Sequence, residues 1–145
     1  MTSLRLSLLF SIVLIIGIPS AWGQGDKDAT KQLVGTWMLT RHTTVMDGQL
    51  TEHLTGAQDY FFEFFKDGTY VAHYNDKDEG DTKNEGKWRV IDNGKAISFY
   101  DNNPESPGEF PDYEVNILGL TDEELIMEEY LFVDDPIGKS YYQKK

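Results

Sequence analysis

Residues 60–74 read YFFEFFKDGTYVAHY, and this stretch decides the fold class. Apolar residues, most of them aromatic, lie on both sides of Lys66-Asp67-Gly68, which is a turn signal between two strands. If the turn is a three-residue loop with Gly68 in the left-handed conformation, Phe64 lies opposite Tyr70. A tight two-residue Asp-Gly turn would change these partners. We predict the three-residue loop, because it leaves Glu63 in water.

A second hairpin is predicted around Asn93-Gly94, a dipeptide typical of a type I′ turn. Pairing back from this turn sets Trp88 against Phe99 on one apolar face, and Ser98 then points away from that face. The two hairpins share the same character, because each presents aromatic residues on one side. A sheet with a single buried face is therefore expected.

The rest of the chain from Leu33 onward consists of short strands separated by turn signals, without a helical period of useful length. Further strands are predicted at 33–46, 113–117, 125–133 and 139–144. The segments 50–59, 75–85 and 101–112 are predicted to be connections. Eight strands with short connections favour one all-β domain, a small antiparallel up-and-down barrel that closes to remove its edges. A β-sandwich is the alternative.

The first 23 residues have the pattern of a signal peptide. Arg5 supplies a positive charge, 6–18 is almost unbroken hydrocarbon, and Ala21-Trp22-Gly23 places small residues where a signal peptidase needs them. An uncleaved membrane anchor is the alternative, but the apolar run is shorter than the ~20 residues that span a bilayer. We predict a signal peptide over 1–23, cleaved near Gly23, a flexible tail over 24–32 and a barrel domain over 33–145. The mature protein would be secreted or periplasmic.

The composition limits the kinds of partner. Of 145 residues, 25 are Asp or Glu and 13 are Lys or Arg, so the formal net charge is −12. Such a surface repels phosphate backbones and anionic membranes, which makes nucleic acid and, after cleavage, the membrane poor partners. The chain has no cysteine, so thiolate metal sites and cysteine nucleophiles are excluded.

Three short motifs resemble those of bacterial lipocalin-like domains: LVGTW at 33–37, FFKDGTY at 64–70 and GKW at 86–88. The resemblance implies a calycin-type barrel with one end closed by Trp37 and the other end open. Gly35 and Trp37 would then form a structural plug, and many relatives bind small hydrophobic molecules. A cation over the Trp37 ring would add a contact, with Lys139 and Arg41 as the two candidates.

The aromatic residues have two interpretations. They either fill the barrel as its core or line an apolar pocket whose mouth lies opposite Trp37. In the second case the ligand-binding residues are the inward positions of the two hairpins: Phe62, Phe64, Tyr70, Trp88 and Phe99. The candidate partner is then a small apolar or amphipathic molecule, and the oligomeric state stays open.

No pattern in the sequence indicates catalysis, a metal or a cofactor. Strand alternation places His42 and His73 on the outside, and His53 lacks a second histidine one turn on. The acidic segment 76–87 fails the calcium-loop spacing, because its glycine is fifth rather than sixth. We therefore expect an exported non-enzymatic barrel that binds a small ligand. The alternative is a protein-interaction or inhibitor module with a solid core and functional loops.

Overall fold

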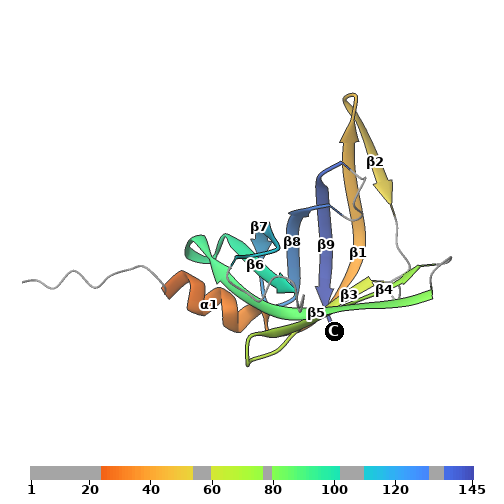
Figure 1. Cartoon of the computed structure of the whole chain (residues 1–145). Coiled ribbons are helices and arrows are strands. Elements are labelled where there is room, and N and C mark those ends of the chain that lie inside the picture. The colour runs from red at the N-terminus through yellow and green to blue at the C-terminus, as the bar shows by residue number, and fades with distance from the viewer. Residues whose placement is uncertain (1–23, 54–59, 77–79, 102–109, 131–135) are drawn as a thin grey trace, which may run out of the picture.

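A computed structural model describes residues 24–53, 60–76, 80–101, 110–130 and 136–145 (Figure 1). In chain order its elements are α1 (Gln24–Leu33), β1 (Gly35–Met46), β2 (Gln49–His53), β3 (Tyr60–Phe64), β4 (Thr69–Asp76), β5 (Gly80–Ile91), the short 3-10 turn η1 (Asp92–Gly94), β6 (Ala96–Asp101), β7 (Tyr113–Leu120), β8 (Glu124–Glu129) and β9 (Gly138–Lys144).

The strands form one antiparallel sheet that closes on itself. Their order is β2-β1-β3-β4-β5-β6-β7-β8-β9, and β1 also pairs with β9. Eight strands therefore close the barrel, which confirms the predicted all-β fold. The ninth, β2, lies mostly within 50–59, which was predicted to be an irregular or weakly helical connection, and it pairs with residues 42–46 of β1. It extends the sheet outside the closed ring, because a two-residue turn at Asp47-Gly48 folds the chain straight back.

Both predicted hairpin registers are confirmed. Phe64 pairs with Tyr70, and Gly68 has a φ of +84°, the left-handed conformation that the three-residue loop requires. Trp88 pairs with Phe99. At the second turn Asn93 and Gly94 both have positive φ, as a type I′ turn needs. Glycine is also required beside this hairpin: a Cβ on Gly86 would collide with the Tyr100 carbonyl oxygen.

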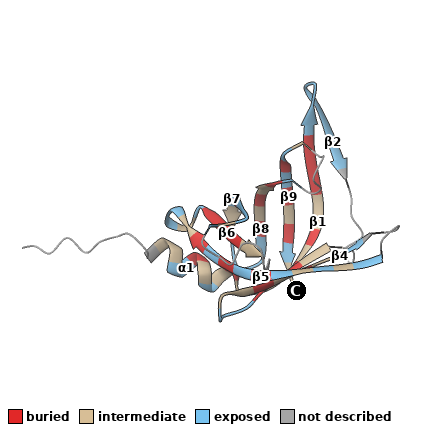
Figure 2. Cartoon of the chain, in the orientation of Figure 1, coloured by how far each residue is buried: buried red, intermediate tan, exposed pale blue. Residues whose placement is uncertain are grey.

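The connection predicted at 75–85 is wrong. β4 and β5 continue through it and stay in register as far as Asp76 and Gly80. The polar residues of this segment were interpreted as a loop. They form strands instead, because this part of the hairpin extends beyond the core and both of its faces lie near water (Figure 2). Most of the predicted connection 101–112 lies outside the described residues.

The predicted flexible tail is wrong too, because 24–33 is a helix. Among residues 25–33 only Ala29 and Leu33, spaced four apart, are buried, so the amphipathic pattern rests on two residues. The helix forms because it docks on the β5–β6 turn. The Asp26 carboxylate accepts the Gly94 backbone N–H at 2.7 Å, and the Lys144 ammonium donates to the Gln32 carbonyl at 2.7 Å.

The barrel has two distinct ends. We call the end that carries Trp37 the base, and the register places the turns at 65–68 and 92–95 there, together with α1. The rim is the opposite end, where β3 begins, β6 ends and β7 begins. The connection between β6 and β7 therefore starts and finishes at the rim. The hydrophobic core fills the barrel from the base upward.

Candidate functional site

The five predicted ligand-binding residues lie together in the barrel, and all are buried: Phe62, Phe64, Tyr70, Trp88 and Phe99. Their rings pack against one another, with centroid distances of 4.9 Å between Phe64 and Trp88 and 5.7 Å between Phe62 and Phe99. These are ordinary aromatic core contacts. In the described part of the chain these side chains therefore fill the lower barrel and form a floor.

The predicted plug residues lie at the base. Trp37 is fully buried, and its indole N–H donates to the Leu33 carbonyl at 2.6 Å. The cation over its ring is Lys144, 5.0 Å from the ring centroid, and neither of the two predicted candidates. Arg41 instead lies over Tyr141 on the outer face. Gly35 has a φ of +134°, and a Cβ there would lie 2.7 Å from the Lys144 Cε, so glycine lets the lysine stem reach the tryptophan.

Above the aromatic floor, polar groups gather toward the rim. We call this set the rim layer; its members are Tyr60, Tyr70, Tyr113, Tyr142, His42, Asp101, Glu129 and Ser140. On one side the Tyr70 hydroxyl donates a hydrogen bond to the Asp101 carboxylate and lies 3.5 Å from the Tyr113 hydroxyl. Asn84 donates to the second Asp101 oxygen at 3.3 Å. Burial raises the pKa of both Tyr70 and Tyr113, so both stay neutral hydroxyl groups at physiological pH.

The other side of the rim layer is built on β1, β8 and β9. The Tyr142 hydroxyl donates a hydrogen bond to the buried Glu129 carboxyl. Ser140 also bonds to Glu129 and lies 2.7 Å from Nδ1 of the buried His42. Burial raises the pKa of Glu129 and, with the nearby carboxylate, that of Tyr142 and Tyr60. Both protonation states of Glu129 keep a hydroxyl partner in this arrangement.

The sequence analysis missed this half of the layer, and its outward placement of His42 is wrong. A β-bulge between Leu39 and Arg41 inserts one residue against β9. Alternation therefore changes sides: Leu39 faces inward before the bulge and His42 faces inward after it. Alternation along the strand gives no signal for a bulge. Gly138 completes the site, since a Cβ there would lie 2.6 Å from the His42 Nε2 atom.

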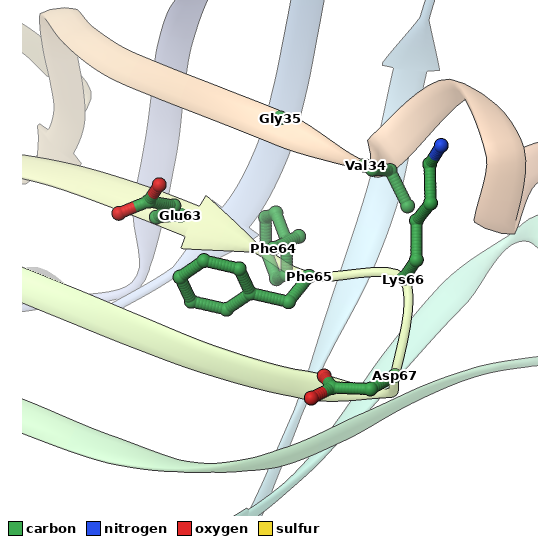
Figure 3. Close-up of a pocket in the computed structure, with 7 residues that line it drawn as sticks. All are labelled: Val34, Gly35, Glu63, Phe64, Phe65, Lys66 and Asp67. Atoms are coloured by element: carbon green, nitrogen blue, oxygen red, sulfur yellow. The ribbon is translucent and has the colours of Figure 1, made fainter.

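An open hollow lies outside the barrel, beside the β3–β4 turn at the base (Figure 3). Its volume is about 450 Å³, and its lining includes the apolar side chains of Val34, Phe64 and Phe65. Lys66 extends along one side toward Val34 in Figure 3. Of the five predicted ligand-binding residues only Phe64 borders this hollow. The hollow is therefore not the predicted chamber lined by all five residues.

The chemistry available to the rim layer is hydrogen bonding. Among residues 24–53, 60–76, 80–101, 110–130 and 136–145, no group of three or more His, Asp or Glu side chains is arranged to hold a metal ion. Ser140 and His42 contact each other but are both fully buried, so the serine hydroxyl is not presented to solvent. Tyrosine rings with hydroxyl tips can contact both apolar and polar parts of a small molecule.

A closed eight-stranded antiparallel barrel with a tryptophan-filled base and an aromatic floor defines the class of protein as a small calycin-type barrel. Residues 33–127 match the family described as the lipocalin-like domain, and the chain belongs to that family. No curated protein matches the chain. Within the described residues, no helix is both long and apolar enough to cross a membrane.

Two solved structures share the fold. One is a lipocalin-like protein from Bacteroides uniformis, 23% identical, with a TM-score of 0.53; the match covers 79% of this chain and 99% of that one. The other is an uncharacterized protein from Bacteroides eggerthii, 18% identical, also with a TM-score of 0.53, and the match covers 77% of this chain and 98% of that one. At these identities the likeness establishes the fold alone.

Proposed function

We propose that this chain is an exported, non-enzymatic barrel protein that binds a small apolar or amphipathic molecule at the rim. The observation that carries the proposal is the rim layer above the aromatic floor, at the end opposite Trp37. There, tyrosine hydroxyl groups and two carboxyl groups stand over packed rings. A ligand would rest on the floor residues and exchange hydrogen bonds with the tyrosine hydroxyl groups of the layer. Tyr70 belongs to both sets.

Export and the absence of catalysis are parts of the same proposal. The 1–23 pattern supports export, and the family's barrel supports a binding role. The buried position of Ser140 and His42 argues against hydrolysis, because a substrate would have to enter the packed wall to reach the hydroxyl.

A second candidate function is a protein-interaction module with a solid barrel. The packing that favours it is the filled lower barrel, where the five predicted lining residues contact one another. A small domain can spare little core for an empty chamber. The two candidates differ in what fills the upper barrel, and a ligand experiment separates them.

The experiment has two arms. Native mass spectrometry of protein purified from its source should reveal a co-purifying small molecule. Titration of the native protein with the neutral dye Nile red should then give saturable one-to-one binding. Tyr113→Ala, which removes a ring stacked 4.7 Å from Phe99, should weaken dye binding several-fold. Tyr100→Ala on the next strand should not, because Tyr100 bonds to Arg89 instead. Dye binding that appears only on partial unfolding would instead favour the solid interaction module.

A further inference from the structure

Strand β2 is the edge of the sheet. It ends the strand order and, in the part of the chain that the structure describes, pairs only with β1. The Asp47-Gly48 turn has positive φ at both residues, and Met46 pairs with Gln49 across it. Such a turn makes the flanking pair the hydrogen-bonded one. The backbone N–H and C=O groups of Leu50 therefore point away from β1, toward the open edge.

This edge has little of the usual protection. Exposed edge strands are commonly blunted by charged side chains, above all lysine, by proline, by a bulge or by being very short. The strand is short, and Glu52 is its one acidic residue. Residues 49–53 read QLTEH and contain neither lysine nor proline, and their register with β1 is unbroken. The β1–β2 hairpin projects beyond the barrel, and its tip is exposed on both strands (Figures 1 and 2).

An exposed apolar row ends on the same strand. Leu50 pairs with Val45, and their exposed fractions are 70% and 62%. Thr44 and Glu129 both pair with Gly138, so the next residues continue the row through Ile137 and Tyr130. These are 49% and 62% exposed. Leu50 and Val45 lie on β2 and β1, Ile137 directly precedes β9 and Tyr130 directly follows β8, so the four exposed residues extend one apolar row on the outside of the barrel. A contiguous patch of this kind marks an interaction surface.

We propose that β2 pairs with β2 of a second copy of this chain, antiparallel and about a two-fold axis at Leu50. Leu50 then faces Leu50 of the partner subunit and exchanges two backbone hydrogen bonds with it. The apolar row becomes continuous across both barrels. Such self-complementarity is what a two-fold interface requires, and it favours a second copy over an unrelated partner.

Charge agrees with this register. Glu52 lies opposite Gly48 of the partner subunit, so the pairing opposes no two acidic residues in a chain of net charge −12. Centring the axis on Thr51 instead would place Leu50 opposite Glu52 of the partner subunit and interrupt the apolar row. The Leu50-centred register is therefore the specific form of the proposal.

Single-cysteine variants test the pairing, since the chain contains no cysteine. In Leu50→Cys the two Cα atoms would lie about 5.5 Å apart, within disulfide range. Mild oxidation should give a covalent dimer of Leu50→Cys at a rate that falls little on dilution. Leu118→Cys, an exposed site on β7, should stay monomeric under the same conditions. Faster crosslinking of Thr51→Cys than of Leu50→Cys would overturn the register.

Light scattering after size exclusion tests the dimer itself. The unmodified chain should have the mass of two copies at high concentration, and Leu50→Lys should have the mass of one while keeping its circular dichroism spectrum. A wild-type chain that remains monomeric at millimolar concentration would overturn the proposal, whether or not the rim binds Nile red.

Discussion

Replacing Trp37 by alanine should remove most of the stability of the domain. The indole is fully buried, donates to the Leu33 carbonyl and lies under the Lys144 ammonium. Aromatic side chains bury about 150–250 Å² each, which at about 25 cal/mol per Å² is roughly 4–6 kcal/mol. Large-to-small aromatic substitutions in cores cost about 3–5 kcal/mol. The total free energy of unfolding of a native protein is only about 5–15 kcal/mol.

Urea unfolding followed by circular dichroism measures this loss. With a slope of about 2 kcal/mol per M, a loss of 4 kcal/mol lowers the midpoint by about 2 M. Trp37→Phe keeps a ring but leaves the Leu33 carbonyl without its donor, so it should lower the midpoint by less, about 0.5–1 M. Tyr141→Ala is the control, because its ring packs under Arg41 on the outer face. If Trp37→Ala shifted the midpoint no more than Tyr141→Ala, the indole would not hold the base together.

Three further predictions concern other parts of the chain. Burial raises the folded-state pKa of Glu129 above its unfolded value of about 4.3, so the folded state holds the proton more tightly. The contribution of Glu129 to the free energy of unfolding therefore falls as pH rises from about 4.3 through the folded-state pKa. Urea midpoints across that range should therefore fall less for Glu129→Gln than for wild type, and parallel curves would contradict the burial argument. Asp26→Ala removes the acceptor of the Gly94 N–H and should destabilise the domain by about 1 kcal/mol and speed amide exchange in α1; unchanged exchange would mean that α1 docks without this bond. N-terminal sequencing of the exported protein should begin at Gln24 or within two residues of it, and Met1 in that fraction would refute cleavage.

The sequence predicted the two hairpins well because their turns determine register. Gly68 and Gly94 both occupy left-handed conformations, and each turn then determines which residues face each other. The alternation of apolar residues determined the inward face, since every inward position of 60–74 except Ala72 is aromatic. The same reasoning placed Phe62, Phe64, Tyr70, Trp88 and Phe99 on one buried surface.

Alternation failed where the backbone departs from a regular strand or where the partner is distant. The bulge in β1 turns His42 inward, and the residue between Leu39 and Arg41, Thr40, carries no sequence signal for a bulge. Helix α1 is stabilised by contacts with η1, some 60 residues away, rather than by its own weak amphipathic pattern. Glu129 was indistinguishable from its exposed neighbours, because its burial depends on Tyr142 and Ser140 from another strand.

The closure of the barrel by its first and last strands has a consequence for folding. The Thr40 hydroxyl bonds to the Tyr141 carbonyl, 101 residues further along the chain, and β1 pairs with β9 over most of its length. Contacts so distant in sequence carry a large loop-closure cost and slow the folding of β proteins. Until β9 (Gly138–Lys144) is in place, β1 and β8 each lack one neighbouring strand, although β1 already pairs with β3 and β8 with β7. The sheet therefore stays open during folding until β9 pairs with both β1 and β8.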